Sequence, residues 1–242
     1  IGMNLYHRFS KIFPKPCIIE MGGKNPAIVT GNADLEAAAE GIMRSSFGLG
    51  GQKCSACSRA YIDKNVFTEF MDILVKKTRA ILIGDPTAKE IFLGPLVNKQ
   101  AYIAYQSYIE SAKMDGRVIY GGNVCTGSEF EKGYFVEPAI ITDLPEDHHL
   151  VKNELFCPIL YVQSVQGLQE ALALANDTEY GLTAGLFSNN EKEINTFFNS
   201  IRAGVTYVNR RSGATTGAWP GVQPFCGWQS SGSTGKGCCG PY

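Results

Sequence analysis

Short apolar runs alternate with amphipathic helical stretches along most of the chain. Each run has the length of a buried strand, and each helical stretch carries apolar residues on one face. This alternation is typical of an α/β sandwich with a mainly parallel sheet. We therefore predict a three-layer α/β/α fold. The expected strands are 17–21, 26–30, 59–63, 118–120, 134–142, 159–162, 182–187 and 205–208. The expected helices are 2–13, 65–80, 168–175 and 191–201, one that begins near Leu35 and ends at Gly48, and one that follows Val97 and carries Tyr105, Tyr108, Ile109 and Ala112 on its inner face.

The composition is that of a soluble globular protein, because 44% of the 242 residues are hydrophobic and 19% are charged. A net charge of −1 gives no reason to expect a nucleic-acid partner or an anionic membrane surface. No apolar run has the length needed to span a bilayer, and no N-terminal segment has the pattern of a signal peptide. The eight cysteines fit reduced thiols better than a disulfide framework. We expect a cytoplasmic protein, or one of the mitochondrial matrix in a eukaryote.

The stretch 50–59 holds the first candidate for chemistry. It opens with two glycines, which let the backbone approach a neighbouring group closely, and Cys54 follows between Lys53 and Arg59. Nearby cations favour the thiolate, which is the reactive form of cysteine. Cys54 also lies where a helical stretch gives way to a strand, a place where scaffolds tend to present catalytic groups. We interpret Cys54 as a candidate nucleophile.

Glu20 is the candidate base. A thiol that attacks an aldehyde needs, later in the reaction, a base that activates water. Glu20 ends an apolar run and precedes Gly22 and Gly23, so we expect its carboxylate to be half-buried. The alternative is a structural ion pair between Glu20 and Lys24 or Lys53.

Cys54 and Cys57 allow two other interpretations, a dithiol redox pair and half of a zinc site. Zinc needs two further ligands, and the adjacent Cys238 and Cys239 are poorly spaced to supply them. We therefore expect no metal, and we interpret Cys57 as a small buried thiol. The glycine-rich stretch 232–237 lacks the spacing of a phosphate-binding loop, and it is either a substrate-facing loop or a solvent loop.

Three short motifs stand in order along the chain. They are Glu20-Met21-Gly22-Gly23-Lys24-Asn25-Pro26, Gly51-Gln52-Lys53-Cys54 and Glu154-Leu155-Phe156. Further landmarks follow them, namely Asn176, Tyr180-Gly181-Leu182, Gly204-Val205, Asn209 and Pro224-Phe225. In order and spacing this set resembles the aldehyde dehydrogenase superfamily over essentially the whole chain. The resemblance implies the fold of that superfamily's catalytic domain, with the nucleophile in a cleft.

The resemblance also implies roles for individual residues. Cys54 would be the nucleophile and Glu20 the general base. Glu154 would hold the nicotinamide ribose and Phe156 would lie against the nicotinamide, so the implied cofactor is NAD, with NADP also possible. The oxyanion would be held by the Cys54 amide and by a side-chain amide elsewhere.

The stretch 52–59 and the loop 231–233 are most similar to the branch of the superfamily that oxidises glutamate γ-semialdehyde, the open form of 1-pyrroline-5-carboxylate. There, Ser55, Gly232 and Ser233 would anchor the substrate carboxylate. The implied substrate is thus a small aldehyde that carries a carboxylate. Two alternatives stay open: another branch, such as one acting on succinate semialdehyde, and a non-catalytic module that keeps only the fold.

The resemblance implies a division of the chain into three parts. Residues 1–19 would be the tail of a preceding cofactor-binding domain, residues 20–208 the catalytic domain, and residues 209–242 a segment that faces substrate and cofactor. We expect the NAD-binding half to be absent, the chain alone to have no dehydrogenase activity, and the full-length protein to be a homo-oligomer. Cysteines stand where the superfamily leads us to expect glycine, at Cys157, Cys226, Cys238 and perhaps Cys239. A side chain at position 157 would be expected to crowd the nicotinamide.

Overall fold

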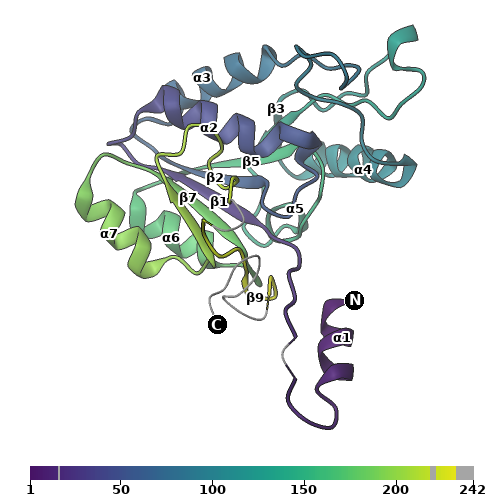
Figure 1. Ribbon diagram of the computed structural model, residues 1–242. Helices are drawn as coiled ribbons and strands as arrows, with labels where there is room; N and C mark the ends of the chain where they lie inside the picture. The colour runs from purple at the N-terminus through teal and green to yellow at the C-terminus, as the bar shows by residue number, and fades with distance from the viewer. Residues whose placement is uncertain (16, 219–221, 233–242) are drawn as a thin grey trace.

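A seven-stranded, mostly parallel sheet forms the centre of the molecule (Figure 1). The computed structural model describes residues 1–15, 17–218 and 222–232. The strand order is β3-β4-β5-β2-β1-β7-β8, and only the edge pair β3–β4 is antiparallel. The strands of this sheet are β1 (Asn25–Val29), β2 (Cys57–Asp63), β3 (Arg117–Tyr120), β4 (Ala139–Thr142), β5 (Ile159–Val165), β7 (Thr183–Phe187) and β8 (Val205–Val208). A separate two-stranded ribbon joins β6 (Tyr180–Gly181) to β9 (Trp228–Gln229).

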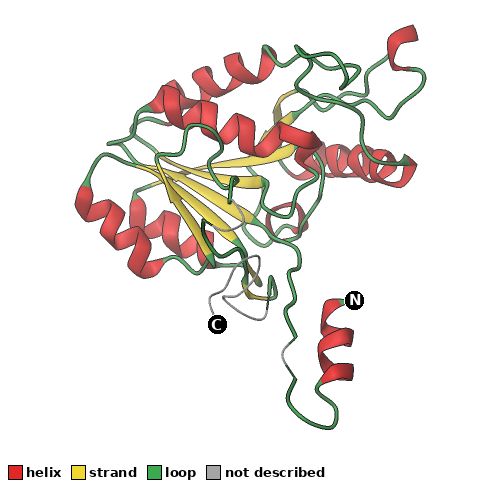
Figure 2. Cartoon of the chain, in the orientation of Figure 1, coloured by secondary structure: helices red, strands yellow, loops and turns green. Residues whose placement is uncertain are grey.

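Helices cover both faces of the sheet, as Figure 2 shows. The helices are α1 (Gly2–Phe9), α2 (Leu35–Phe47), α3 (Phe67–Arg79), α4 (Lys99–Asp115), α5 (His149–Lys152), α6 (Leu168–Asn176) and α7 (Glu191–Ser200). Short 3-10 turns occur at η1 (Gly48–Gly51) and η2 (Ser128–Phe130). The prediction of a three-layer α/β/α sandwich is confirmed.

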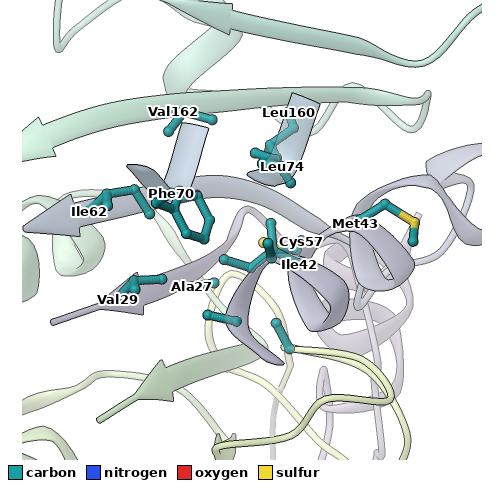
Figure 3. Close-up of a cluster of buried hydrophobic side chains, with 14 of the residues drawn as sticks. Ala27, Val29, Ile42, Met43, Cys57, Ile62, Phe70, Leu74, Leu160 and Val162 are labelled. Atoms are coloured by element: carbon teal, nitrogen blue, oxygen red, sulfur yellow. The ribbon is translucent and has the colours of Figure 1, made fainter. Parts of the chain in front are cut away.

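Alternation along the strands decides which helices pack where. Ala27 and Val29 of β1 belong to the cluster beneath α2 and α3, whereas Ile28 between them belongs to the cluster beneath α6 and α7. Figure 3 shows the first cluster, in which Ile42 and Phe70 from the two helices meet side chains of the sheet. A third cluster joins α4 to β4 and β5. Because both faces are covered, the central strands are mainly apolar, with Arg59 of β2 as a buried exception, and this is why they could be predicted from sequence.

Two predicted strands differ in the structure. The run 17–21 is not a buried strand: Ile18 is 60% exposed, and Glu20 makes only an isolated bridge to Gly232. The run is apolar, but within the described residues it joins no strand of the central sheet. The run 134–142 is a strand only over β4, because Pro138 lacks the N–H that a longer ladder would need.

Helix α1 lies apart from the sheet in Figure 1 and buries none of its own residues. Its Gly2 approaches the side chains of Ile19 and Met21. No helix in the described ranges combines the length and the apolar character needed to cross a membrane.

Candidate active site

The candidate nucleophile sits on a turn between η1 and β2. Gly50 and Gly51 both have φ of +66°, a conformation that glycine adopts without strain. A Cβ on Gly51 would run into the carbonyl oxygen of Cys157, so this glycine lets two backbone segments touch. The Gln52 side chain then accepts a hydrogen bond from the Val97 amide at 2.8 Å. The turn that carries Cys54 is therefore fixed on both of its flanks.

The Cys54 thiol is half-buried and hydrogen-bonds to the Glu20 carboxylate. Burial raises the pKa of this thiol to about 12, and the hydrogen bond and negative charge of Glu20 add to the effect. The backbone N–H of Ser55 donates to the sulfur and acts in the opposite direction. The structure thus brings the predicted nucleophile and the predicted base into direct contact, with the thiol in its neutral form.

The prediction that two cations favour the thiolate is wrong for Arg59. Its guanidinium is fully buried on the far side of the turn, where it donates to the carbonyl oxygens of Lys24, Leu174 and Ala175 at 2.7–3.1 Å. Only Lys53 lies near the sulfur, and burial lowers the pKa of its ammonium while the Cys54 thiol raises it. Burial and Glu20 therefore dominate the state of Cys54.

Glu20 is exposed, so the expectation of a half-buried carboxylate is wrong as well. The reason is that Glu20 lies outside the sheet, in a bridge to Gly232 near the C-terminal end of the described chain. The next residue strengthens this link, because the Met21 amide donates to the Ser231 carbonyl at 2.9 Å. The Ser231 hydroxyl in turn donates to the Gly22 carbonyl at 2.6 Å.

Gly22 and Gly23 allow Glu20, Cys54 and Glu154 to share one small site. A Cβ on Gly22 would lie 2.5 Å from the Glu154 carboxylate, and one on Gly23 would lie 2.6 Å from the Cys54 carbonyl oxygen. The Gly23 amide donates to Glu154 Oε1 at 2.9 Å. Two consecutive glycines are needed here because side chains at these positions would separate the nucleophile from Glu154.

Glu154 and Phe156, the residues of the third motif, lie beside the nucleophile turn. Burial raises the pKa of the Glu154 carboxyl, partly offset by the Gly23 hydrogen bond and by the charge of Lys24. Phe156 has φ of +57° and its ring is 45% exposed. Cys157 is buried in the core cluster with α4. That a side chain at position 157 crowds the nicotinamide stays a prediction.

The residues expected to hold a substrate carboxylate are only partly visible. Ser55 follows Cys54 directly, and Gly232 is held next to Glu20 by the bridge, so both lie at the nucleophile. Ser233 lies outside the described residues, as do Cys238 and Cys239.

Cys57 is buried in the core cluster beneath α2, which confirms its interpretation as a packing residue. Within residues 1–15, 17–218 and 222–232, no three His, Cys, Asp or Glu side chains gather as a metal site would require.

Asn25 is a site residue that sequence reasoning missed. Its side-chain amide is 1% exposed and donates to the carbonyl oxygens of Cys54 and Ala56 at 2.8 and 2.9 Å. Its Oδ1 accepts from the Thr183 amide at 3.0 Å, so every polar atom of this side chain has a partner. The available signal was a polar residue at the first position of an otherwise apolar strand.

A family model for the aldehyde dehydrogenase family matches residues 1–238. The chain belongs to this family. Among aldehyde dehydrogenases, 1-pyrroline-5-carboxylate dehydrogenase of Bacillus mycoides is 39% identical over 98% of this chain and 45% of its own length. The protein of Geobacillus kaustophilus with the same name is 36% identical over the same shares.

Solved structures of aldehyde dehydrogenases agree with the fold. A Thermus 1-pyrroline-5-carboxylate dehydrogenase with bound NAD superposes with a TM-score of 0.87 at 34% identity, over 96% of this chain and 44% of that one. A betaine aldehyde dehydrogenase from Staphylococcus aureus in complex with NAD⁺ gives 0.87 at 26% identity, over 96% of this chain and 45% of that one. The chain thus spans less than half the length of the relatives it matches.

Proposed function

We propose that this chain is the catalytic portion of an NAD-dependent aldehyde dehydrogenase that oxidises glutamate γ-semialdehyde to glutamate. The contact between the Cys54 thiol and the Glu20 carboxylate, on a turn whose backbone is fixed, carries this proposal. It is the arrangement that covalent aldehyde chemistry requires, with the nucleophile and a proton acceptor within reach of each other. The proposed substrate rests on the similarity to 1-pyrroline-5-carboxylate dehydrogenases.

The neutral thiol defines the first chemical step. As the Cys54 sulfur attacks the aldehyde carbon, its proton passes to the Glu20 carboxylate to which it is already hydrogen-bonded. The new oxyanion would be stabilised by the backbone amide of Cys54. Once Glu20 has released its proton, it can take one from water, and the attack of that water on the Cys54 thioester releases the carboxylate product.

The residues present fit a nicotinamide cofactor. Glu154 offers a half-buried carboxylate with Oε1 held by Gly23, which leaves Oε2 to accept from a ribose hydroxyl. Phe156 offers an exposed ring next to it, against which a nicotinamide could lie. The cofactor, when bound, supplies the acceptor for the hydride that leaves the substrate carbon. NADP is the alternative cofactor.

Ser55, Gly232 and Ser233 would bind the carboxylate of the substrate. Hydroxyl and amide donors suit this task because they bind an anion without placing a cation beside the nucleophile. We also propose a cytoplasmic enzyme whose full-length form is a homo-oligomer, with residues 1–19 belonging to the cofactor-binding domain.

A chimera tests the proposed function. The chain would replace the matching segment of the Thermus enzyme, and NADH formation would be followed with 1-pyrroline-5-carboxylate and with succinate semialdehyde. We expect NADH from the first substrate, competition by glutamate but not by succinate, and loss of activity in Cys54→Ala but not in Cys125→Ala. The 242-residue chain alone should form none. A folded chimera that prefers succinate semialdehyde would overturn the proposed substrate, and one that oxidises neither aldehyde would favour a non-catalytic module.

A further inference from the structure

Three successive carbonyl groups of the nucleophile turn are held by side chains from elsewhere in the fold. Asn25 binds the Cys54 and Ala56 carbonyls, and the Thr215 hydroxyl donates to the Ser55 carbonyl at 2.7 Å. Thr215 lies in the loop after β8 and is fully buried. Its position, 160 residues from Ser55 in the chain, gives no hint of this contact in the sequence.

A second hydroxyl from helix α2 supports Thr215. The Thr215 hydroxyl has one proton, and that proton goes to Ser55, so Ser45 is the donor in the 2.8 Å contact between the two hydroxyls. The Thr215 amide donates back to the Ser45 oxygen at 3.2 Å, and the Ala214 amide donates to the Gly41 carbonyl at 2.9 Å. The loop segment that carries Thr215 is thereby attached to the buried face of α2.

The effect of Thr215 reaches the Cys54 amide through two peptide planes. In a planar trans peptide the C=O and the N–H point in opposite directions. Because Thr215 holds the Ser55 carbonyl, the Ala56 N–H of the same peptide is turned inward, where it donates to the Lys53 carbonyl at 3.1 Å. The Lys53 carbonyl and the Cys54 N–H belong to one peptide group. Because the carbonyl points toward Ala56, the Cys54 N–H points away from Ala56 and out of the turn.

We propose that Thr215 is a positioning residue that aims the Cys54 N–H at the oxyanion formed on the attacked carbon. This inference rests on the proposed use of the Cys54 amide as an oxyanion donor. Thr215 itself touches neither substrate nor sulfur, and it acts through Ala56 and Lys53. Asn25 acts on the neighbouring peptide, whose Ser55 N–H donates to the sulfur.

Two reagents distinguish the role of the Cys54 N–H, which would bind an oxyanion, from that of the Ser55 N–H, which donates to the sulfur. Both are applied to the 242-residue chain without cofactor. With p-nitrophenyl acetate, the Cys54 sulfur bonds to the acyl carbon, its proton passes to Glu20, an oxyanion forms, and p-nitrophenolate leaves as the C–O bond breaks. With iodoacetamide, the sulfur displaces iodide and no oxyanion forms. Both rates would be measured at the Cys54 peptide by mass spectrometry.

Thr215→Val should slow acylation of Cys54 about fivefold to tenfold, the loss expected for one misplaced hydrogen bond, and leave alkylation unchanged within about twofold. Thr215→Ser should restore the acylation rate. Thr78→Val is the matched control, because Thr78 is equally buried and also donates to a backbone carbonyl, that of Leu74, but lies on α3 away from the site. Thr78→Val should change neither rate.

Two results would overturn the proposal: an unchanged acylation rate in folded Thr215→Val, or equal losses in both reactions, which would mean that the whole turn has loosened. If Thr215→Val fails to fold, Ser45→Ala removes the supporting hydroxyl and should produce the same selective loss of acylation. An unchanged acylation rate in Ser45→Ala would then count equally against the proposal. Since no aldehyde or cofactor is used, a failure of the proposed dehydrogenase function would leave this comparison intact.

Discussion

At the residue scale, the nucleophile Cys54 is a protonated thiol that lies next to its proton acceptor, the Glu20 carboxylate. The pKa of Cys54, raised to about 12 by burial and by Glu20, leaves very little free thiolate at neutral pH. Cys54 must then react by losing its proton to Glu20 during the attack, rather than as a thiolate that is present beforehand. The arrangement protects the sulfur from indiscriminate electrophiles.

Glu20→Gln tests this account. Gln can donate to sulfur and carries no charge, so the pKa of Cys54 should fall and alkylation by iodoacetamide at pH 8 should become about tenfold faster per unit of that fall. The pH profile of alkylation at the Cys54 peptide measures it. Glu129→Gln, a change in η2 far from the site, is the control, and an unchanged profile for Glu20→Gln would show that Glu20 has no part in holding the proton.

Lys24 gives a second prediction at this scale, in stability. Its side chain is buried, its Nζ has no hydrogen-bond partner in the described structure, and burial lowers its pKa to about 7. Between pH 7 and about 10.4, the unfolded chain therefore binds more protons at this residue, so its cost to stability is greatest below pH 7 and fades as pH rises. Lys24→Met should raise the free energy of unfolding most at pH 6–7.

The measurement is chemical denaturation at pH 6.5 and pH 10, where the stabilisation by Lys24→Met should be at least about 1 kcal/mol at the lower pH and should shrink at the higher one. The exposed Lys113 on α4 provides the control, since Lys113→Met should give no comparable dependence on pH. A gain of equal size at both pH values would contradict the assigned protonation.

Some site residues could be predicted from sequence and others could not. Cys54, Glu20 and Glu154 stand in motifs whose residue types reveal their chemistry, and the structure brings all three together. Arg59 was misplaced because two of its three carbonyl partners, Leu174 and Ala175, come from the end of α6, 115 and 116 positions away. Asn25 and Thr215 act on backbone groups, and nothing in a linear pattern records such contacts.

At the scale of elements, the glycines of η1 decide whether α2 can connect to the nucleophile turn at all. Gly51→Ala should disrupt the site for two reasons, because φ is +66° and because the new methyl group would meet the Cys157 carbonyl. We expect a loss of about 2–4 kcal/mol in unfolding free energy and an altered alkylation rate at Cys54.

Gly31→Ala is the matched comparison for this change. A Cβ on Gly31 would lie 3.9 Å from Asp63, which is ordinary contact, so this variant should cost little. Thermal unfolding of both variants measures the difference. Equal stability of Gly51→Ala and the unmodified chain would mean that the turn adapts to a side chain.

The strands that are buried most completely were the ones that could be predicted from sequence. Strands β1, β2, β5, β7 and β8 are mainly apolar and were found from sequence. The run 17–21 was misassigned because its composition is that of a strand, whereas in the described residues it forms an isolated bridge at Glu20 and belongs to no strand of the central sheet. Composition records how apolar a segment is, but the position of neighbouring strands decides whether it pairs.

At the scale of the whole molecule, buried thiols set an alkaline limit to stability. The pKa values of the buried thiols of Cys57 and Cys157 are each raised to about 12, mainly by burial, whereas an unfolded thiol titrates near about 8.5. The unfolded chain therefore loses these protons first, and stability should fall as pH rises from about 8.5 to 12.

Urea denaturation of the chain at pH 8 and pH 10 measures this effect under reducing conditions. We expect a loss at pH 10 of up to about 1 kcal/mol per buried thiol and pH unit. Cys157→Ala removes one titrating group and should reduce the difference between the two pH values. An unchanged difference in that variant would assign the alkaline loss to other groups.

The hydrogen bond from Ser231 to Gly22 also affects the stage of folding at which the site forms. It joins residues 209 positions apart, so the segment bearing Glu20 is fixed only after nearly all of the intervening chain has folded. Helix α2 and strand β2, which flank Cys54, also depend on segments from later in the chain, because the Thr215 hydroxyl contacts Ser45 of α2 and β5 pairs with β2. The nucleophile turn, held by Thr215, and the segment that bears Glu20, held by Ser231, therefore both depend on the last part of the described chain, and catalytic competence would be acquired in the closing stage of folding.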